Sequence, residues 1–251
     1  PFRSNLKFAS GQLFLANQDN TIYSINPVNG EKKWQFATAL TFLKTDFKNN
    51  FVIDKSSNSL FFLNTSGELY SINFINQKIN WVMNFKTSSL ASDTDLFLSL
   101  PIVLRDANLL IVTENSLLNY NFITSFKNWS FSTKTLLKPI LTSNYTYVLA
   151  KNNLLICLKN KTGEIIWSKN IYKSLSDKKI IKKIGKLYDF KIINSELNIF
   201  SKNGYVLSFS PNNGKFKFVK KISNNGISSE VIFLRDNIFL IDNKNKLLIF
   251  N

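Results

Sequence analysis

The sequence predicts an all-β protein, a β-propeller made of four-stranded antiparallel blades. The first observation is a repeated motif in which an aromatic residue stands four residues after a tight-turn position. The copies pair Gly30 with Trp34, Gln77 with Trp81, Ser125 with Trp129, Gly163 with Trp167 and Gly214 with Phe218. The second observation is that the same elements precede each copy: a strand, a two-residue turn, a second strand and a polar turn. Such repeats, with a period of about 40–50 residues, are typical of propeller blades.

Each copy of the motif contains a predicted β-hairpin rich in β-branched and aromatic residues, which favour strands. The first strands are Gln12–Ala16, Ser59–Leu63, Asn108–Val112, Tyr145–Leu149 and Glu196–Phe200. The second strands, counted back from the aromatic position, are Thr21–Ile25, Glu68–Ile72, Ser116–Tyr120, Leu155–Lys159 and Gly204–Ser208. The pairs that supply the positive φ angles of the tight turns are Asp19-Asn20, Ser66-Gly67, Asn115-Ser116, Asn152-Asn153 and Asn203-Gly204.

Two further strands complete each predicted blade. One carries the aromatic residue, and a short one precedes the hairpin. The short strands are Leu6–Ala9, Phe51–Asp54, Pro101–Leu104, Pro139–Thr142 and Leu187–Ile193. A sixth hairpin, Asn237–Asn243 followed by Lys246–Phe250, has no aromatic-bearing strand after it. Helical periodicity is not sustained, and only Ile171–Lys186 is predicted to be a helical or disordered insertion.

The polar turn before each aromatic residue has a recurring chemistry. Pro27 and Pro211 occupy the same motif position, where proline presets φ for a turn. Gly30, Gly163 and Gly214 occupy another, as expected for a residue with positive φ. Gln77 and Ser125 replace that glycine in two copies, so we expect those turns to be strained or altered.

We expect residues 1–251 to form a single β-propeller domain that is incomplete at one or both ends. Six hairpins are visible, and the blade motifs lie near residues 6–36, 51–85, 101–133, 139–170, 187–221 and 231–251. The sequence starts at Pro1 with neither an initiator methionine nor a signal peptide, which indicates a processed or excised piece.

The charge balance is strongly basic, with 32 Lys and Arg residues against 16 Asp and Glu residues. One interpretation is an anionic partner, and the other is a lysine-rich compositional bias without a function. The lysines are scattered except for Lys178, Lys179, Lys182, Lys183 and Lys186. Nucleic-acid-binding proteins usually concentrate charge in one stripe with exposed aromatic residues, so the sequence argues against nucleic acid.

The sequence contains few residues suited to catalysis or metal binding. Histidine, the commonest general base and metal ligand, is absent. The single cysteine, Cys157, lies in the apolar run Leu154–Leu158 and is expected to be a buried small hydrophobic residue. No apolar run approaches the roughly 20 residues that span a bilayer.

The segment Tyr23–Gly30 followed by Trp34, and the segment Lys161–Glu164 followed by Trp167, resemble the PQQ-type β-propeller repeat. The resemblance covers nearly the whole chain. In that family each tryptophan packs against the turn of a neighbouring blade. The resemblance therefore implies a structural docking role for Trp34, Trp81, Trp129, Trp167 and Phe218, with the turn glycines Gly30, Gly163 and Gly214.

The resemblance leaves two branches of the family open. The quinoprotein dehydrogenases hold a quinone and a calcium ion on the propeller axis and usually carry a ring of two adjacent cysteines. A single Cys157 excludes that cysteine ring, and no converging set of acidic ligands for calcium is legible. We therefore expect no catalytic residue, no metal and no cofactor, with an oxidoreductase or a basic, polyanion-binding sensor as the alternatives.

The other branch, the BamB-like proteins, is non-catalytic. The resemblance implies a monomeric, usually eight-bladed scaffold in the periplasm that binds the periplasmic domains of a BamA-type partner during outer-membrane β-barrel assembly. A lipid anchor outside this piece would attach such a protein to the outer membrane. The partner surface in that family is formed by two neighbouring loops between blades. By position the resemblance implies Leu136, Leu137 and Lys138 in one loop, and Leu175 and Asp177 in the other.

Overall fold

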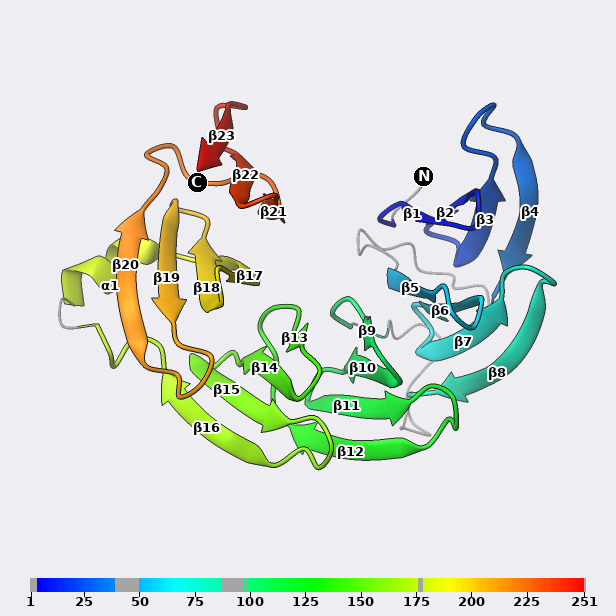
Figure 1. Cartoon of the computed structure of the whole chain (residues 1–251), viewed down its shortest axis with the longest axis horizontal. Helices are drawn as coiled ribbons and strands as arrows, with labels where there is room; N and C mark the ends of the chain where they lie inside the picture. Colours follow the sequence, from blue (N-terminus) through cyan, green and yellow to red (C-terminus); the bar gives the residue numbers. More distant parts are fainter. Residues whose placement is uncertain (1–3, 39–49, 87–96, 98, 176–177, 251) are drawn as a thin grey trace. The chain divides into compact units, whose positions relative to one another are not determined.

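The computed structural model describes residues 4–38, 50–86, 97, 99–175 and 178–250. The chain divides into two compact units. Residues 1–114 and 118–126 belong to the first unit, and residues 115–117 and 127–251 belong to the second. Both are built from antiparallel sheets in which the strands follow one another in chain order (Figure 1).

Among the described residues, five sheets have four strands and one has three. The first two sheets are β1 (Lys7–Ala9), β2 (Gln12–Ala16), β3 (Thr21–Ile25) and β4 (Lys32–Ala37), and β5 (Asn50–Asp54), β6 (Ser59–Leu63), β7 (Glu68–Asn73) and β8 (Lys78–Asn84). The third is β9 (Val103–Arg105), β10 (Asn108–Val112), β11 (Ser116–Asn121) and β12 (Lys127–Ser132). The fourth and fifth are β13 (Ile140–Leu141), β14 (Tyr145–Leu149), β15 (Leu154–Lys159) and β16 (Ile165–Asn170), and β17 (Leu187–Ile193), β18 (Glu196–Ser201), β19 (Tyr205–Phe209) and β20 (Phe216–Lys221). The three-stranded sheet is β21 (Ile232–Leu234), β22 (Asn237–Ile241) and β23 (Leu247–Phe250).

These sheets confirm the predicted four-stranded antiparallel unit of a propeller blade. The strand bounds agree with the predicted hairpins to within two residues at each end. The two-residue differences fall at the start of β9 and at the end of β22.

The strand pairing reveals a shared position opposite each aromatic residue. The pairs across the two strands are Ser24 with Trp34, Ser71 with Trp81, Cys157 with Trp167 and Ser208 with Phe218. This register corrects two predicted second strands, because the fourth was placed one residue too late and the fifth one residue too early. Gly204 consequently lies in the turn and not in β19.

β6 shows why the first hairpin strands contain continuous apolar runs. Side chains alternate between the two faces of a strand. Leu60 and Phe62 belong to a core cluster with residues of β2 and β3. Phe61 and Leu63 belong to a second cluster with residues of β10. The strand is therefore buried on both faces, and burying each of these side chains contributes about 1.5–3 kcal/mol.

A backbone hydrogen bond closes the end of each four-stranded sheet. In every copy an N–H group just after the outermost strand donates to a carbonyl in the hairpin turn. The bonds are Thr38 to Asn20, Phe85 to Gly67, Thr133 to Asn115, Ile171 to Asn153 and Ile222 to Gly204, at 2.8–3.2 Å. Because these bonds use backbone atoms, the repeat keeps its geometry where its side chains differ.

The turn predictions were partly correct. Gln77 and Ser125 have φ angles of 62° and 63°, so both keep the left-handed conformation that Gly30 has at 75°. The strain expected there is the cost of a side chain at positive φ, about 1–2 kcal/mol per residue. The prediction was wrong for Asn115-Ser116, since neither residue is among those with positive φ.

The predicted insertion contains one short helix, α1 (Lys178–Ile184). Its lysines are exposed. Its isoleucines face the protein: Ile184 is buried, and Ile180 and Ile181 pack against the core of the second unit. Gly185 follows with a φ of 69°, the left-handed conformation that commonly ends a helix.

Cys157 is expected to be chemically inert in the folded protein. Burial raises the pKa of its thiol from 9.0 to about 11, against the opposing effect of a hydrogen bond from Tyr147. At pH 8 the reactive thiolate is therefore about a hundredfold scarcer than in the unfolded chain. We expect Ellman's reagent to label the native thiol at least about a hundredfold more slowly than the urea-unfolded one. Equal labelling rates would show that Cys157 is not buried.

The raised pKa also predicts that the stability of the protein falls as the pH rises from 9 to 11, because only the unfolded thiol ionises in that range.

Candidate partner-binding surface

Two tryptophans of the second unit contact the turn of the following sheet in the same way. The indole N–H of Trp129 donates to the carbonyl oxygen of Asn160 at 2.7 Å. That of Trp167 donates to the carbonyl oxygen of Pro211 at 3.0 Å. Each ring also covers the turn glycine, since a Cβ added to Gly163 would meet Trp129 at 2.8 Å, and one added to the equivalent Gly214 would meet Trp167 at 2.6 Å. This is the arrangement that a docking role requires.

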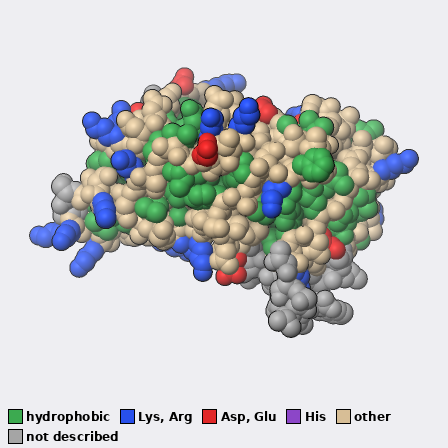
Figure 2. Space-filling view, turned by 90° about the horizontal axis from the view of Figure 1, so that it is seen from below, with side chains coloured by type: hydrophobic (Ala, Val, Ile, Leu, Met, Phe, Trp, Pro, Cys, Tyr) green, Lys and Arg blue, Asp and Glu red, His purple; other side chains and the backbone are tan. Residues whose placement is uncertain are grey.

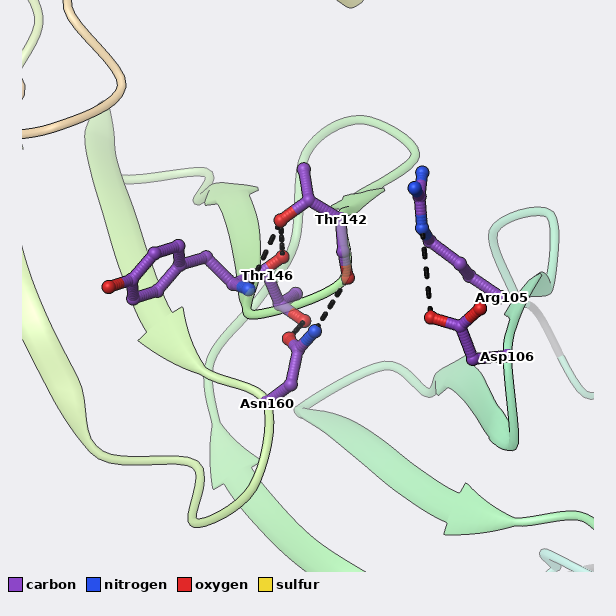
Figure 3. A network of polar contacts seen from close by, with 6 residues as sticks. Arg105, Asp106, Thr142, Thr146 and Asn160 are labelled. Atoms are coloured by element: carbon purple, nitrogen blue, oxygen red, sulfur yellow. Dashed lines mark hydrogen bonds and ion pairs between the residues drawn. The ribbon is translucent and has the colours of Figure 1, made fainter.

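The acceptor of the Trp129 bond is held in place by a polar network. Asn160 is buried, and its amide nitrogen donates to the Thr142 carbonyl at 2.7 Å. The Thr146 hydroxyl donates to the Asn160 amide oxygen, also at 2.7 Å (Figure 3). The backbone N–H of Asn160 donates to the Asn144 carbonyl at 2.9 Å. Three hydrogen bonds other than that of the tryptophan thus hold this turn in place.

Trp34 in the first unit has a different hydrogen-bond partner. Its indole N–H donates to the side-chain oxygen of Gln12 in its own sheet, at 3.1 Å. The following turn instead supplies an apolar side chain, Phe74, which is fully buried. The ring of Phe14 lies 5.8 Å from Trp34 and 5.3 Å from Phe74, and it links the two through aromatic packing.

The remaining predicted docking positions differ in exposure. Trp81 is partly buried against Phe61, whose ring lies 5.1 Å from Phe122 in the following turn. Phe218 is 47% exposed, and β21–β23 offer it no equivalent turn within the part of the chain that the structure describes. Gly30 has no heavy atom within 4 Å of an added Cβ. The docking role of these residues stays a prediction.

The first predicted partner loop, Thr135–Pro139, runs beside β14. The backbone N–H of Leu136 donates to the Leu149 carbonyl at 2.8 Å. Leu136 and Leu137 pack against the core of the second unit but are only partly buried. Lys138 is exposed. The loop therefore combines a fixed backbone with accessible apolar and basic side chains.

The second predicted partner loop meets the same core. Leu175 is 8% exposed and belongs to the cluster against which Leu136 and Leu137 pack, so both loops contribute to one core. Because Leu175 is buried, it can support the surface but not contact a partner directly. Direct contact with a partner would therefore come from the other loop. Asp177 lies outside the described residues.

The lysines that lie beside these loops could not be identified from the sequence. The backbone N–H of Lys202 donates to the Lys186 carbonyl at 2.8 Å, which joins the turn before β19 to the segment after α1. Lys151 is joined to Lys134 by the same kind of bond at 2.7 Å. On the face seen in Figure 2, Lys and Arg side chains are scattered mainly around the edges, with acidic side chains at several positions between them.

No helix in the described part of the chain is both long and apolar enough to cross a membrane. Within the same residues, three or more Asp, Glu, Cys or His side chains nowhere gather into a group that could hold a metal ion.

Comparisons with solved structures agree with the geometry. The crystal structure of BamB from Moraxella catarrhalis is similar to the chain with a TM-score of 0.74, at 12% identity over 97% of this chain and 70% of that one. A structure of KlHsv2 with loop 6CD replaced by a Gly-Ser linker is similar with a TM-score of 0.67, at 8% identity over 100% and 77% of the two chains. The predicted β-propeller fold is thus confirmed. No curated protein matches the chain.

The sequence itself carries the family signal. The family model described as outer membrane protein assembly factor BamB matches residues 1–169, well over half of the chain. The match spans the first four sheets, including the strands with Trp34, Trp81, Trp129 and Trp167. We conclude that the chain belongs to the family of outer membrane protein assembly factor BamB.

Proposed function

We propose that the protein is a non-catalytic scaffold of outer-membrane β-barrel protein assembly that binds the periplasmic domains of a BamA-type partner. The family match carries the proposal. In this proposal the protein works as a monomer in the periplasm and is held at the outer membrane by a lipid anchor. The docking tryptophans keep the sheets rigid, and the variable loops between sheets provide the contacts.

The core cluster shared by the two predicted loops supports the proposed contact surface. Leu136 and Leu137 are anchored on one side by the core and exposed on the other. Preorganised apolar side chains of this kind lose little conformational entropy on binding. Lys138 stands next to them at the rim. We propose that these three residues contact the partner and that Leu175 supports them from below.

Replacing Leu136 with aspartate is expected to weaken binding of BamA-type periplasmic domains by at least about tenfold. The change places a charge in the apolar centre of the proposed contact, which costs about 2 kcal/mol or more. Binding is measured by biolayer interferometry with immobilised partner domains. Val28→Asp, which alters a 91% exposed side chain in the first unit, is the matched control and should bind as the unmodified chain does.

Two further measurements keep this test decisive. A thermal melt checks that Leu136→Asp remains folded, because Leu136 also packs against the core. If it unfolds, Leu137→Ser replaces it as a milder variant of the same surface. A folded variant with unchanged affinity would remove this loop from the interface, and an unmodified chain without measurable affinity would refute the proposed partner.

The scaffold proposal also predicts no quinone chemistry. Incubation of the intact chain with pyrroloquinoline quinone and calcium should leave the absorption spectrum equal to the sum of the components. A saturable spectral change would favour the dehydrogenase alternative.

A further inference from the structure

Five segments far apart in the sequence converge at one end of the sheets in the second unit. The end of α1 is tied to the turn before β19, because the Asn203 amide donates to the Lys183 carbonyl at 2.9 Å. The turn before β19 lies close to Gly226, and Gly226 lies close to the turn before β23. A Cβ added to Gly226 would lie 2.4 Å from the Lys202 carbonyl and 2.6 Å from the Asn243 amide. The other side of α1 packs on the cluster that carries Leu136.

These segments contain an excess of lysine. Residues 134–139, 151–153, 171–186, 202–204 and 243–246 hold twelve lysines and one acidic residue, Asp177. We call these lysines the lysine surface: Lys134, Lys138, Lys151, Lys173, Lys178, Lys179, Lys182, Lys183, Lys186, Lys202, Lys244 and Lys246. All are exposed except Lys202, which is half-buried. The hairpin turns and the insertion thus place at one end of the unit a charge that the sequence spreads over more than a hundred residues.

Three of the described carboxylates lie at the border of this surface. Asp242 is buried in its own turn, where hydrogen bonds from Asn225 and the backbone of Lys244 and Lys246 lower its pKa. Asp189 and Glu230 lie near the ring of Tyr188, at the side of the surface.

Lys202 shows that like charges are close together here. Its ammonium group lies 3.4 Å from the centre of the Tyr188 ring, a cation–π contact. Partial burial and the charge of Lys186 lower the pKa of Lys202. An anionic ligand would relieve this repulsion.

We propose that the lysine surface binds an acidic polypeptide segment of the partner, next to the apolar contact of Leu136 and Leu137. This inference rests on the proposed scaffold function and extends it, because it specifies the chemistry of the partner. An acidic segment with interspersed apolar residues would complement both parts of the surface. Such charge complementarity mainly raises the association rate and the specificity.

The side chains present favour protein over the other polyanions. Nucleic-acid binding usually needs exposed aromatic rings for base stacking, whereas Tyr172 and Tyr188 are partly buried. A membrane-binding helix inserts its apolar face into the lipid, whereas the isoleucines of α1 face the core of the protein. Apolar side chains remain accessible at Leu136 and Leu137, which suits a polypeptide.

Binding of a labelled 15-residue peptide of alternating glutamate and leucine, measured by fluorescence anisotropy, tests the proposal. The charge-reversed variant Lys182→Glu/Lys183→Glu should bind it at least about tenfold more weakly than the unmodified chain. The matched control is Lys161→Glu/Lys215→Glu, which changes the net charge equally. Lys161 and Lys215 are exposed in turns at the opposite ends of β15 and β19, so this variant should lose less than about twofold. A peptide with glutamine in place of glutamate should not bind.

Several outcomes of the peptide-binding experiment would contradict the proposal. Equal losses in the two variants, or no peptide binding by the unmodified chain, would overturn the proposal. So would a preference for vesicles of phosphatidylcholine and phosphatidylglycerol, or for duplex DNA, over the peptide. The same variants are then tested with BamA-type domains. Retained domain binding by Lys182→Glu/Lys183→Glu would overturn this inference but not the scaffold. Peptide binding by a chain that does not bind the domains would refute the proposed partner alone.

Discussion

Replacing Trp129 with alanine is expected to destabilise the protein by about 3–5 kcal/mol. The side chain is buried, with 7% of its surface exposed, so its removal leaves a cavity between β12 and the turn after β15. It also removes the indole N–H that donates to the buried Asn160 carbonyl at 2.7 Å. An unsatisfied buried acceptor accounts for about 1–3 kcal/mol of such a loss. Urea unfolding, followed by tyrosine fluorescence and circular dichroism, measures the change.

Two controls separate the contributions. Trp129→Phe keeps an aromatic ring but loses the hydrogen bond, and it should cost about 1–3 kcal/mol. Phe126→Ala removes a large side chain that is 75% exposed and should change stability by less than about 0.5 kcal/mol. A variant Trp129→Ala that unfolds at the same urea concentration as the unmodified chain would contradict the docking role.

The repeat architecture could be predicted because its signals are local. The apolar run in Ser59–Leu63, the glycine at position 163 and the five-residue turns depend on neighbours within a few residues. The hairpin strands were therefore found to within two residues. The one-residue errors fall in the fourth and fifth copies, where the strand pairing places Cys157 opposite Trp167 and Ser208 opposite Phe218.

The partner of each tryptophan could not be predicted from the sequence. Trp129 bonds a backbone carbonyl, which every residue carries and which therefore leaves no sequence signal. Trp34 bonds a glutamine side chain instead, although both occupy the same motif position. The choice depends on whether the next turn supplies an apolar side chain such as Phe74 or a rigid polar network such as that of Asn160.

The candidate surface was predictable only in part for a related reason. The resemblance placed Leu136 and Leu175 in partner loops, and the structure adds that both meet one core cluster. The contribution of Lys202 depends on its bond to Lys186 across sixteen residues of chain, and that of Lys244 on contacts around Gly226. Only packing between sheets makes these lysines neighbours.

Replacing Gly163 with alanine is expected to destabilise the protein by about 2–5 kcal/mol. One part is the cost of a side chain at its φ of 75°, about 1–2 kcal/mol. The other part is overpacking, about 1–3 kcal/mol, because the added Cβ would lie 2.8 Å from the Trp129 ring. Urea unfolding of the variant measures the sum.

Gly30→Ala isolates the first part. Gly30 has the same motif position and the same φ of 75°, but nothing lies within 4 Å of an added Cβ. It should therefore cost only about 1–2 kcal/mol. Equal losses at the two positions would mean that the Trp129 ring exerts no steric demand on the turn.

The double variant Trp129→Ala/Gly163→Ala then tests whether the ring and the turn act as one unit. Without the indole, the alanine Cβ at position 163 has no ring to overlap, so the overpacking part of the loss should disappear. The two changes together should therefore cost about 1–3 kcal/mol less than the sum of the single losses. If the losses in stability are additive, the loss caused by Gly163→Ala comes from the backbone conformation of the turn and not from overlap with the ring. A coupling of the expected size would show that the repeated glycine and the repeated tryptophan stabilise the fold through their mutual contact.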